Sequence, residues 1–135
     1  MTNLPGALDQ LRILVVDDDP GSLEAVAALL ELNGAEVQTA RGAADAKRIL
    51  RYFKADLVIS DLKMPAEDGF DFIMEIRKLS SEQGGKTPAI AFSGSSDTLS
   101  RARALAYGFQ EYLPKPVEPG FLISTVAALA RRKHR

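Results

Sequence analysis

The hydrophobic and polar residues of this chain follow two alternating patterns, short apolar runs and longer amphipathic segments. The apolar runs predict five β-strands, at residues 13–16, 36–40, 57–60, 89–92 and 110–113. Apolar residues recur every three or four positions in the segments after these runs, which predicts a helix after each strand. Strands that alternate with helices in this way are typical of a parallel sheet with right-handed crossovers. The pattern therefore predicts an α/β domain of (βα)5 type.

The character of each run indicates the place of its strand in the sheet. The first, third and fourth runs are almost entirely apolar, as expected for central strands of a parallel sheet. The second run alternates polar with small or apolar residues, and the fifth is followed closely by Pro114, which cannot donate a ladder hydrogen bond. Both are therefore expected at the edges. The doubly wound order 2-1-3-4-5 satisfies these preferences and creates a ligand-binding switch point between strands one and three.

Length and composition agree with one small domain. The chain has 135 residues, of which 46% are hydrophobic and 26% charged, and its net charge is -1. No apolar run approaches the roughly 20 residues of a membrane span, and the charge balance does not favour nucleic acid as a partner. The absence of cysteine excludes disulfides and thiolate chemistry, and it suits a cytoplasmic location. We predict a domain over residues 12–131, between an N-terminal tail (1–11) and a basic C-terminal tail (132–135).

Polar residues follow directly after four of the predicted strands. They are Asp17, Asp18, Asp19, Asp61, Ser93 and Lys115. The carboxyl ends of parallel strands meet at one edge of the sheet, so most of these side chains should be neighbours in space. Asp19 precedes Pro20 and is expected instead to cap the first helix.

Crowded carboxylates raise one another's pKa unless a cation relieves the repulsion. Magnesium prefers oxygen ligands and typically takes only one or two carboxylates together with phosphate oxygens. Another carboxylate oxygen is then available to attack phosphorus. Lys115 and Ser93 would stabilise the oxygens of a phosphoryl group during its transfer. The residues therefore indicate a site that holds a divalent cation and a phosphoryl group together.

The same residues carry a resemblance to a known family. The motifs run from Ile13 to Pro20 (Ile-Leu-Val-Val-Asp-Asp-Asp-Pro), from Ser60 to Pro65 with Asp68-Gly69, from Phe92 to Gly94, and from Tyr112 to Pro116 (Tyr-Leu-Pro-Lys-Pro). Each motif alone is weak, but all four in this order and at these separations are specific. Over nearly its whole length the chain resembles the receiver (REC) domain of two-component response regulators. The resemblance implies a CheY-like, flavodoxin-like fold and a function in phosphorelay signalling.

The resemblance also implies roles for the acidic residues. Asp61 would be the phosphoacceptor and would accept its phosphoryl group from a phosphohistidine donor. Asp18, Asp61 and the backbone carbonyl of Lys63 would be direct ligands of Mg²⁺, and Asp17 would act mostly through water. The expected cofactor is therefore Mg²⁺, and no enzymatic activity is expected beyond the chain's own phosphotransfer and autodephosphorylation.

Further roles follow from the resemblance for residues around the phosphoryl group. Lys115 would pair with the phosphate, Ser93 would be the switch hydroxyl and Tyr112 the rotating aromatic. The peptide bond before Pro116 is a candidate for the cis form, which X-Pro bonds adopt far more often than others. Lys63, two residues after the acceptor, and Ser95 are expected to tune the lifetime of the phosphoryl group.

The implied partner is a histidine kinase or a histidine phosphotransfer protein, because the only histidine of this chain, His134, lies in the basic C-terminal run. A downstream protein or a second copy would bind the face formed by the fourth helix, the fifth strand and the fifth helix. Neither nucleic acid nor a membrane is an expected partner.

Several functional alternatives stay open at this point. The chain fits either a single-domain response regulator or the receiver segment of a hybrid histidine kinase. It also fits a phosphate sink or relay without conformational output. A Mg-dependent phosphohydrolase is less favoured, since position 63 holds lysine where an acid would be needed to activate water. A flavin or nucleotide binder is disfavoured by the acidic loop after the first strand.

Overall fold

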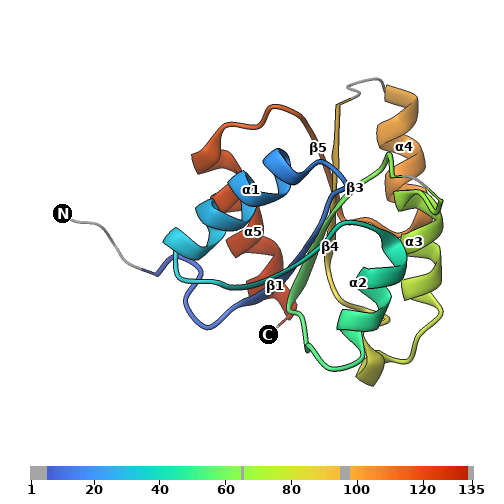
Figure 1. The fold of residues 1–135 in the computed structure, drawn as a ribbon, viewed down its shortest axis with the longest axis horizontal. Helices are drawn as coiled ribbons and strands as arrows, with labels where there is room; N and C mark the ends of the chain where they lie inside the picture. Colours follow the sequence, from blue (N-terminus) through green and yellow to red (C-terminus); the bar gives the residue numbers. More distant parts are fainter. Residues whose placement is uncertain (1–5, 65, 95–97, 134–135) are drawn as a thin grey trace.

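Five parallel strands form one sheet in the order β2-β1-β3-β4-β5 in the computed structural model, which describes residues 6–64, 66–94 and 98–133 (Figure 1). The strands are β1 (Arg12–Val16), β2 (Glu36–Ala40), β3 (Leu57–Asp61), β4 (Ala89–Ser93) and β5 (Glu111–Pro114). The predicted fold class and strand order are thus confirmed. Every residue of β3 and β4 is buried, as expected for central strands covered on both faces.

Helices cover both faces of the sheet. They are α1 (Pro20–Leu32), α2 (Ala43–Leu50), α3 (Gly69–Arg77), α4 (Thr98–Tyr107) and α5 (Pro119–Lys133). Helices α1 and α5 lie on one face, and α2, α3 and α4 lie on the other (Figure 1). The buried apolar residues form two matching clusters, one between the sheet and α1 and α5, and the other between the sheet and α2, α3 and α4. No helix in the described ranges combines the length and apolar character that crossing a bilayer requires.

Local sequence signals explain where several helices begin. The Asp19 carboxylate accepts a hydrogen bond from the Ser22 N–H, and Pro20 occupies the first turn, so α1 begins as predicted. Asp68 caps α3 in the same way through the Asp71 N–H. The segment between α3 and β4 contains a short 3₁₀ helix, η1 (Ser81–Gln83). Its capping box at Ser80 stabilises one turn too short to show an apolar periodicity.

The register of the sheet brings the polar residues to one edge. Val16 pairs with Ser60, so Asp17 and Asp61 lie level at the ends of β1 and β3. On the other side of β3, Asp61 pairs with Phe92, and Ser93 follows in β4. Ser93 in turn pairs with Pro114, which places Lys115 directly beyond the end of β5.

Part of the N-terminal segment packs against the domain. Leu8 is fully buried and its N–H donates to the Asn33 carbonyl at 2.9 Å. Leu11 is also buried, and the Arg131 guanidinium donates to the Ala7 carbonyl at 3.4 Å. Residues 6–11 therefore contribute to the core between the sheet and the helices α1 and α5. At the other end of the chain, His134 lies outside the described residues.

Candidate functional site

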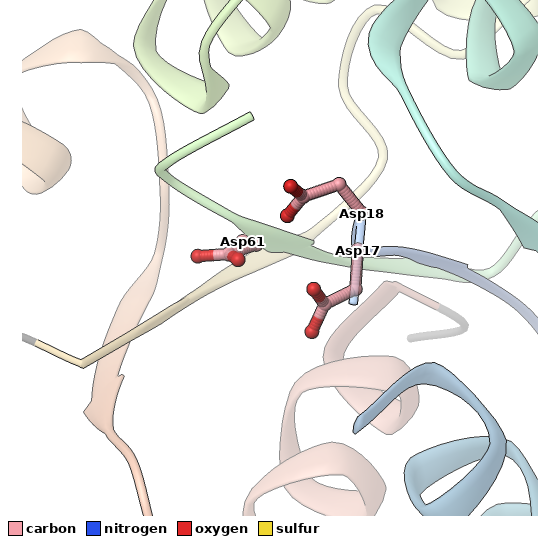
Figure 2. Close-up of side chains that lie close together, drawn as sticks. All are labelled: Asp17, Asp18 and Asp61. Carbon is pink, nitrogen blue, oxygen red and sulfur yellow. The ribbon is translucent and has the colours of Figure 1, made fainter. Parts of the chain in front are cut away.

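Three carboxylates gather at the ends of β1 and β3. One oxygen from each of Asp17, Asp18 and Asp61 lies within 4.8 Å of the other two. Figure 2 shows the Asp17 and Asp18 side chains diverging from the chain just beyond β1, with the Asp61 carboxylate beside them. Asp17 and Asp61 are buried and Asp18 is partly exposed, so the cluster is open to solvent on the Asp18 side.

Lys115 supplies the positive charge next to this cluster. Its ammonium lies 3.0 Å from Asp17 Oδ2 and 3.5 Å from Asp61 Oδ2. The other oxygen of Asp17 accepts a hydrogen bond from the Asp19 N–H at 3.0 Å. The Lys63 N–H donates to Asp61 Oδ1 at 3.3 Å. The peptide bond between Lys115 and Pro116 is cis.

The two buried carboxyls differ in acidity. Burial alone would raise the pKa of Asp17, but the Asp19 N–H and the Lys115 ammonium outweigh it, so this pKa lies below its ordinary value. Burial raises the pKa of Asp61 above its ordinary value, and the more distant Lys115 ammonium does not compensate. Burial would lower the pKa of Lys115, yet the two carboxylates raise it, which keeps the ammonium charged.

The residue types and spacing of the acidic cluster fit a hard divalent cation. Magnesium is bound in proteins by carboxylate and carbonyl oxygens together with water, and three carboxylate oxygens converge here. Both oxygens of Asp17 already accept hydrogen bonds from Asp19 and Lys115. No ion pair or hydrogen bond of the Asp18 side chain is found in the part of the chain that the structure describes. Among the three carboxylates, Asp18 is thus the one whose oxygens carry no hydrogen bond within these described residues.

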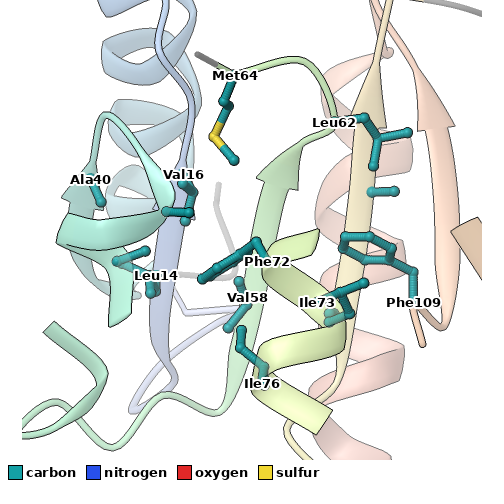
Figure 3. Close-up of a cluster of buried hydrophobic side chains, with 14 of the residues drawn as sticks. Leu14, Val16, Ala40, Val58, Leu62, Met64, Phe72, Ile73, Ile76 and Phe109 are labelled. Carbon is teal, nitrogen blue, oxygen red and sulfur yellow. The ribbon is translucent and has the colours of Figure 1, made fainter. Parts of the chain in front are cut away.

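Ser93 and Tyr112 lie on neighbouring strands near the cluster. Both side chains are almost completely buried, with 2% of their surface exposed. Ser93 ends β4 at the site edge, and Tyr112 packs with Ala104 of α4 and Phe109 in the cluster drawn in part in Figure 3. The Tyr112 ring, for which the resemblance implies rotation, thus occupies an inward position in this structure. Ser95 lies outside the described residues.

A cavity of about 590 Å³ opens beside the acidic cluster. Its lining comes from the loops after β1, β3 and β4 and from the first turns of α3 and α4: Asp18, Leu62, Lys63, Met64, Asp68, Phe70, Ser93, Ser100 and Arg103. Lys63 is exposed and lines this cavity two residues after Asp61. Arg103 is a residue that the sequence pattern did not indicate, since it follows no strand and belongs to no motif.

The start of α3 and the end of β3 are in close backbone contact beside this cavity. The Gly69 N–H donates to the Leu62 carbonyl at 2.8 Å. A Cβ atom at position 69 would lie only 2.4 Å from the Asp61 carbonyl oxygen and 2.8 Å from Leu62 Cα. Glycine at this position therefore allows the start of α3 to pack directly against the end of β3.

Comparison with known proteins gives a consistent result. A family model described as "Response regulator receiver domain" matches residues 13–127. A protein of Leptolyngbya boryana, described as an "Uncharacterized 14.6 kDa protein in sodA1 3'region", is 41% identical over 119 residues, which are 88% of this chain and 89% of that protein. The transcriptional regulatory protein PrrA of Mycobacterium leprae is 34% identical over 122 residues, 90% of this chain but 51% of that protein.

A solved structure agrees. The crystal structure of a response regulator receiver domain protein from Clostridium thermocellum is 33% identical, with a TM-score of 0.83 over 92% of this chain and 97% of that one. The chain thus spans almost all of this relative, but only about half the length of the transcriptional regulatory proteins it matches.

Proposed function

Because the chain belongs to the response regulator receiver family, we propose that it accepts a phosphoryl group on Asp61 and acts as a switch in a two-component phosphorelay. One observation carries this proposal: three carboxylates and one lysine ammonium converge at the carboxyl ends of β1, β3 and β5. The donor would be a phosphohistidine on a histidine kinase or a histidine phosphotransfer protein. We place this activity in the cytoplasm, where such donors present their phosphohistidine.

The chemistry follows from the side chains of the site. An oxygen of Asp61 forms a bond to phosphorus while the donor's P–N bond breaks and the electron pair returns to the histidine nitrogen. Lys115, now 3.5 Å from Asp61, is within reach of the oxygens of the transferred group, and the Ser93 hydroxyl approaches from β4. A Mg²⁺ ion held by Asp18, Asp61 and the Lys63 carbonyl would supply charge neutralisation of the phosphoryl oxygens.

The raised pKa of Asp61 is compatible with this role. A carboxyl that is hard to ionise in the folded protein gains from any cation that arrives beside it. Asp17, in contrast, is held ionised by Lys115 and by the Asp19 N–H. We propose that Asp17 contributes through an ordered water, while it keeps Lys115 at the site.

A phosphorylated Asp61 would offer the Ser93 hydroxyl a charge-assisted hydrogen-bond partner. Because Ser93 ends β4 and Tyr112 packs beneath α4, a shift of Ser93 would be transmitted to the face formed by α4, β5 and α5. We propose this face as the binding surface for a downstream protein or a second copy. Ser95 and Lys63 would set how long the phosphoryl group survives.

Intact mass after incubation with Mg²⁺ and a small phosphodonor tests the proposal. The expected result is one added phosphoryl group that requires Mg²⁺ and is lost on treatment with hydroxylamine, as expected of an acyl phosphate. The Asp61→Asn variant should show no adduct, and Asp71→Asn, which changes an exposed acid on α3, should behave as the wild type. A full adduct on Asp61→Asn would contradict the acceptor assignment. Steady turnover of a phosphomonoester would indicate a phosphohydrolase instead.

A further inference from the structure

Arg103 of α4 is held in place by two aromatic rings. Its guanidinium carbon lies 4.0 Å from the centroid of the Phe70 ring and 5.2 Å from that of Tyr107. The two rings meet edge to face at 5.6 Å. Phe70 is buried in the first turn of α3, so its ring gives the arginine a rigid support. Stacking of this kind fixes the plane of a guanidinium and leaves its N–H groups directed outward.

The arginine borders the same cavity as the acceptor site. Arg103 lines the cavity of about 590 Å³ together with Asp18, Lys63 and Ser93. Asp18 lies within 4.8 Å of Asp61, measured between carboxylate oxygens. Arg103 is exposed, and over residues 6–64, 66–94 and 98–133 its guanidinium has ring contacts but no ion pair or hydrogen bond. An oriented cation with free donors therefore faces the open side of the site.

The direction of phosphoryl transfer gives this cation a function. In an in-line transfer the nucleophile and the leaving group lie on opposite sides of phosphorus. Lys115 contacts Asp17 and Asp61, on the inner side of the acceptor. The cavity adjoins the cluster at Asp18, its solvent-open side, so a leaving group that departs through the cavity passes the rim that carries Arg103. Guanidinium groups match the geometry of carboxylates and bind them with two parallel hydrogen bonds.

We propose that Arg103 stabilises the leaving carboxylate when the phosphodonor is a small acyl phosphate. The proposal rests on Asp61 being the phosphoacceptor. In the reaction, the bond from an Asp61 oxygen to phosphorus forms as the donor's bond between phosphorus and its acyl oxygen breaks. The electron pair stays on the acyl oxygen, and the negative charge that develops there meets the Arg103 guanidinium.

The proposal predicts a difference between two small donors. Acetyl phosphate releases an acetate anion, whereas phosphoramidate releases neutral ammonia, because its nitrogen is protonated as the P–N bond breaks. A contact with the leaving carboxylate should therefore matter for acetyl phosphate and not for phosphoramidate. A purely structural role of Arg103, as a link between α3 and α4, would affect both donors equally.

The test compares second-order rate constants of phosphorylation for both donors, at fixed Mg²⁺, in the wild type and in Arg103→Gln, Arg103→Lys and Arg101→Gln. Arg101 is exposed on the same helix and is not part of the cavity lining, so its variant is a matched loss of charge. For Arg103→Gln the rate constant with acetyl phosphate should fall about three- to fivefold, the scale expected for a solvent-exposed charge pair. The rate with phosphoramidate should stay within a factor of about two, and Arg103→Lys should recover part of the loss.

Each other outcome has a distinct meaning. Equal losses with both donors would overturn the proposal in favour of a structural role, and so would an equal loss in Arg101→Gln. Unchanged rates with both donors would overturn it as well. If the wild type shows no phosphorylation with either donor, the proposed function itself fails, and this result is recognisable because it does not depend on Arg103.

Discussion

The Lys115 ammonium lies closer to Asp17 than to the proposed acceptor, at 3.0 Å against 3.5 Å. The Asp19 N–H and this ammonium together lower the pKa of Asp17, whereas burial raises the pKa of Asp61 despite the same lysine. The two carboxyls stand on adjacent strands at the same level, but they differ in their protein partners. Asp17 accepts its two hydrogen bonds at 3.0 Å each, whereas the two to Asp61 are longer, at 3.3 and 3.5 Å. We therefore expect Asp61 to exchange its protein partners for a metal more readily than Asp17.

This difference leads to a prediction about metal affinity. Asp18→Ala should weaken Mg²⁺ binding by at least about tenfold, or ~1.4 kcal/mol, because it removes a direct ligand. Asp17→Ala should weaken it less, since both oxygens of Asp17 are engaged by Asp19 and Lys115. Titration of the two variants with Mg²⁺, followed by calorimetry or intrinsic fluorescence of the tyrosines, gives the comparison directly. Equal losses in the two variants would show that the direct and water-mediated ligands have been exchanged.

The lifetime of the phosphoryl group should depend on the side chain of Lys63. The residue is exposed at the cavity, and its backbone N–H already binds the Asp61 carboxylate at 3.3 Å. Its ammonium would sit over the phosphoryl oxygens and restrict the approach of water. Lys63→Ala should therefore lose the phosphoryl group faster, by about two- to fivefold for an exposed charge. Decay of the phosphorylated form after donor removal measures this, with Lys86→Ala, an exposed lysine in the loop before β4, as the control. Identical decay in Lys63→Ala and the wild type would mean that this ammonium points into solvent.

Substitution of Gly69 tests how closely the start of α3 must pack against the end of β3. In Gly69→Ala the new methyl group would meet the Asp61 carbonyl oxygen at 2.4 Å, so α3 or the end of β3 must move. The expected cost is about 1–3 kcal/mol of unfolding free energy, as for other overpacked positions. Gly21→Ala is the matched control, because a Cβ there meets nothing within 4 Å and the residue is already helical. Urea unfolding of both variants measures this cost. An unchanged midpoint for Gly69→Ala would show that α3 or the end of β3 can shift with little loss of unfolding free energy.

The sequence was sufficient for the fold because each strand carries a distinct pattern. The continuous apolar runs correctly predict β1, β3 and β4 at the centre, and the register then brings Asp17, Asp61 and Lys115 to one edge. Other features depend on contacts between segments that are distant in the chain. Leu8 precedes the first strand, outside the alternation of strands and helices, and it is buried through contacts with the core between the sheet and the helices α1 and α5.

Two arginines also have contacts that the sequence pattern could not predict. The Arg77 guanidinium is partly buried and donates to the carbonyls of Gly85, Thr87 and Gly108, which joins the end of α3 to two loops. On the sequence it is one of several basic residues at the end of a helix. Arg103 likewise becomes notable only when α4 packs beside Phe70 at the cavity. Positions defined by long-range packing leave no local pattern, whereas residues that follow directly after strands do.

The last prediction concerns how far a change at Asp61 reaches. Ser93 ends β4, α4 follows in the chain, and Tyr112 of β5 is buried in one apolar cluster with Ala104 of that helix and Phe109. A phosphoryl mimic on Asp61 that draws the Ser93 hydroxyl toward it should therefore shift the packing between α4 and β5. Adding Mg²⁺ and beryllofluoride should move backbone amide resonances from Ser93 to Tyr112, and not only those of residues beside the acidic cluster. The same additions to Asp61→Asn should leave the α4 and β5 resonances in place. If the wild-type shifts stop at the strand ends, the chain is better explained as a phosphate relay or sink, in which Asp61 stores the phosphoryl group without changing the face formed by α4, β5 and α5.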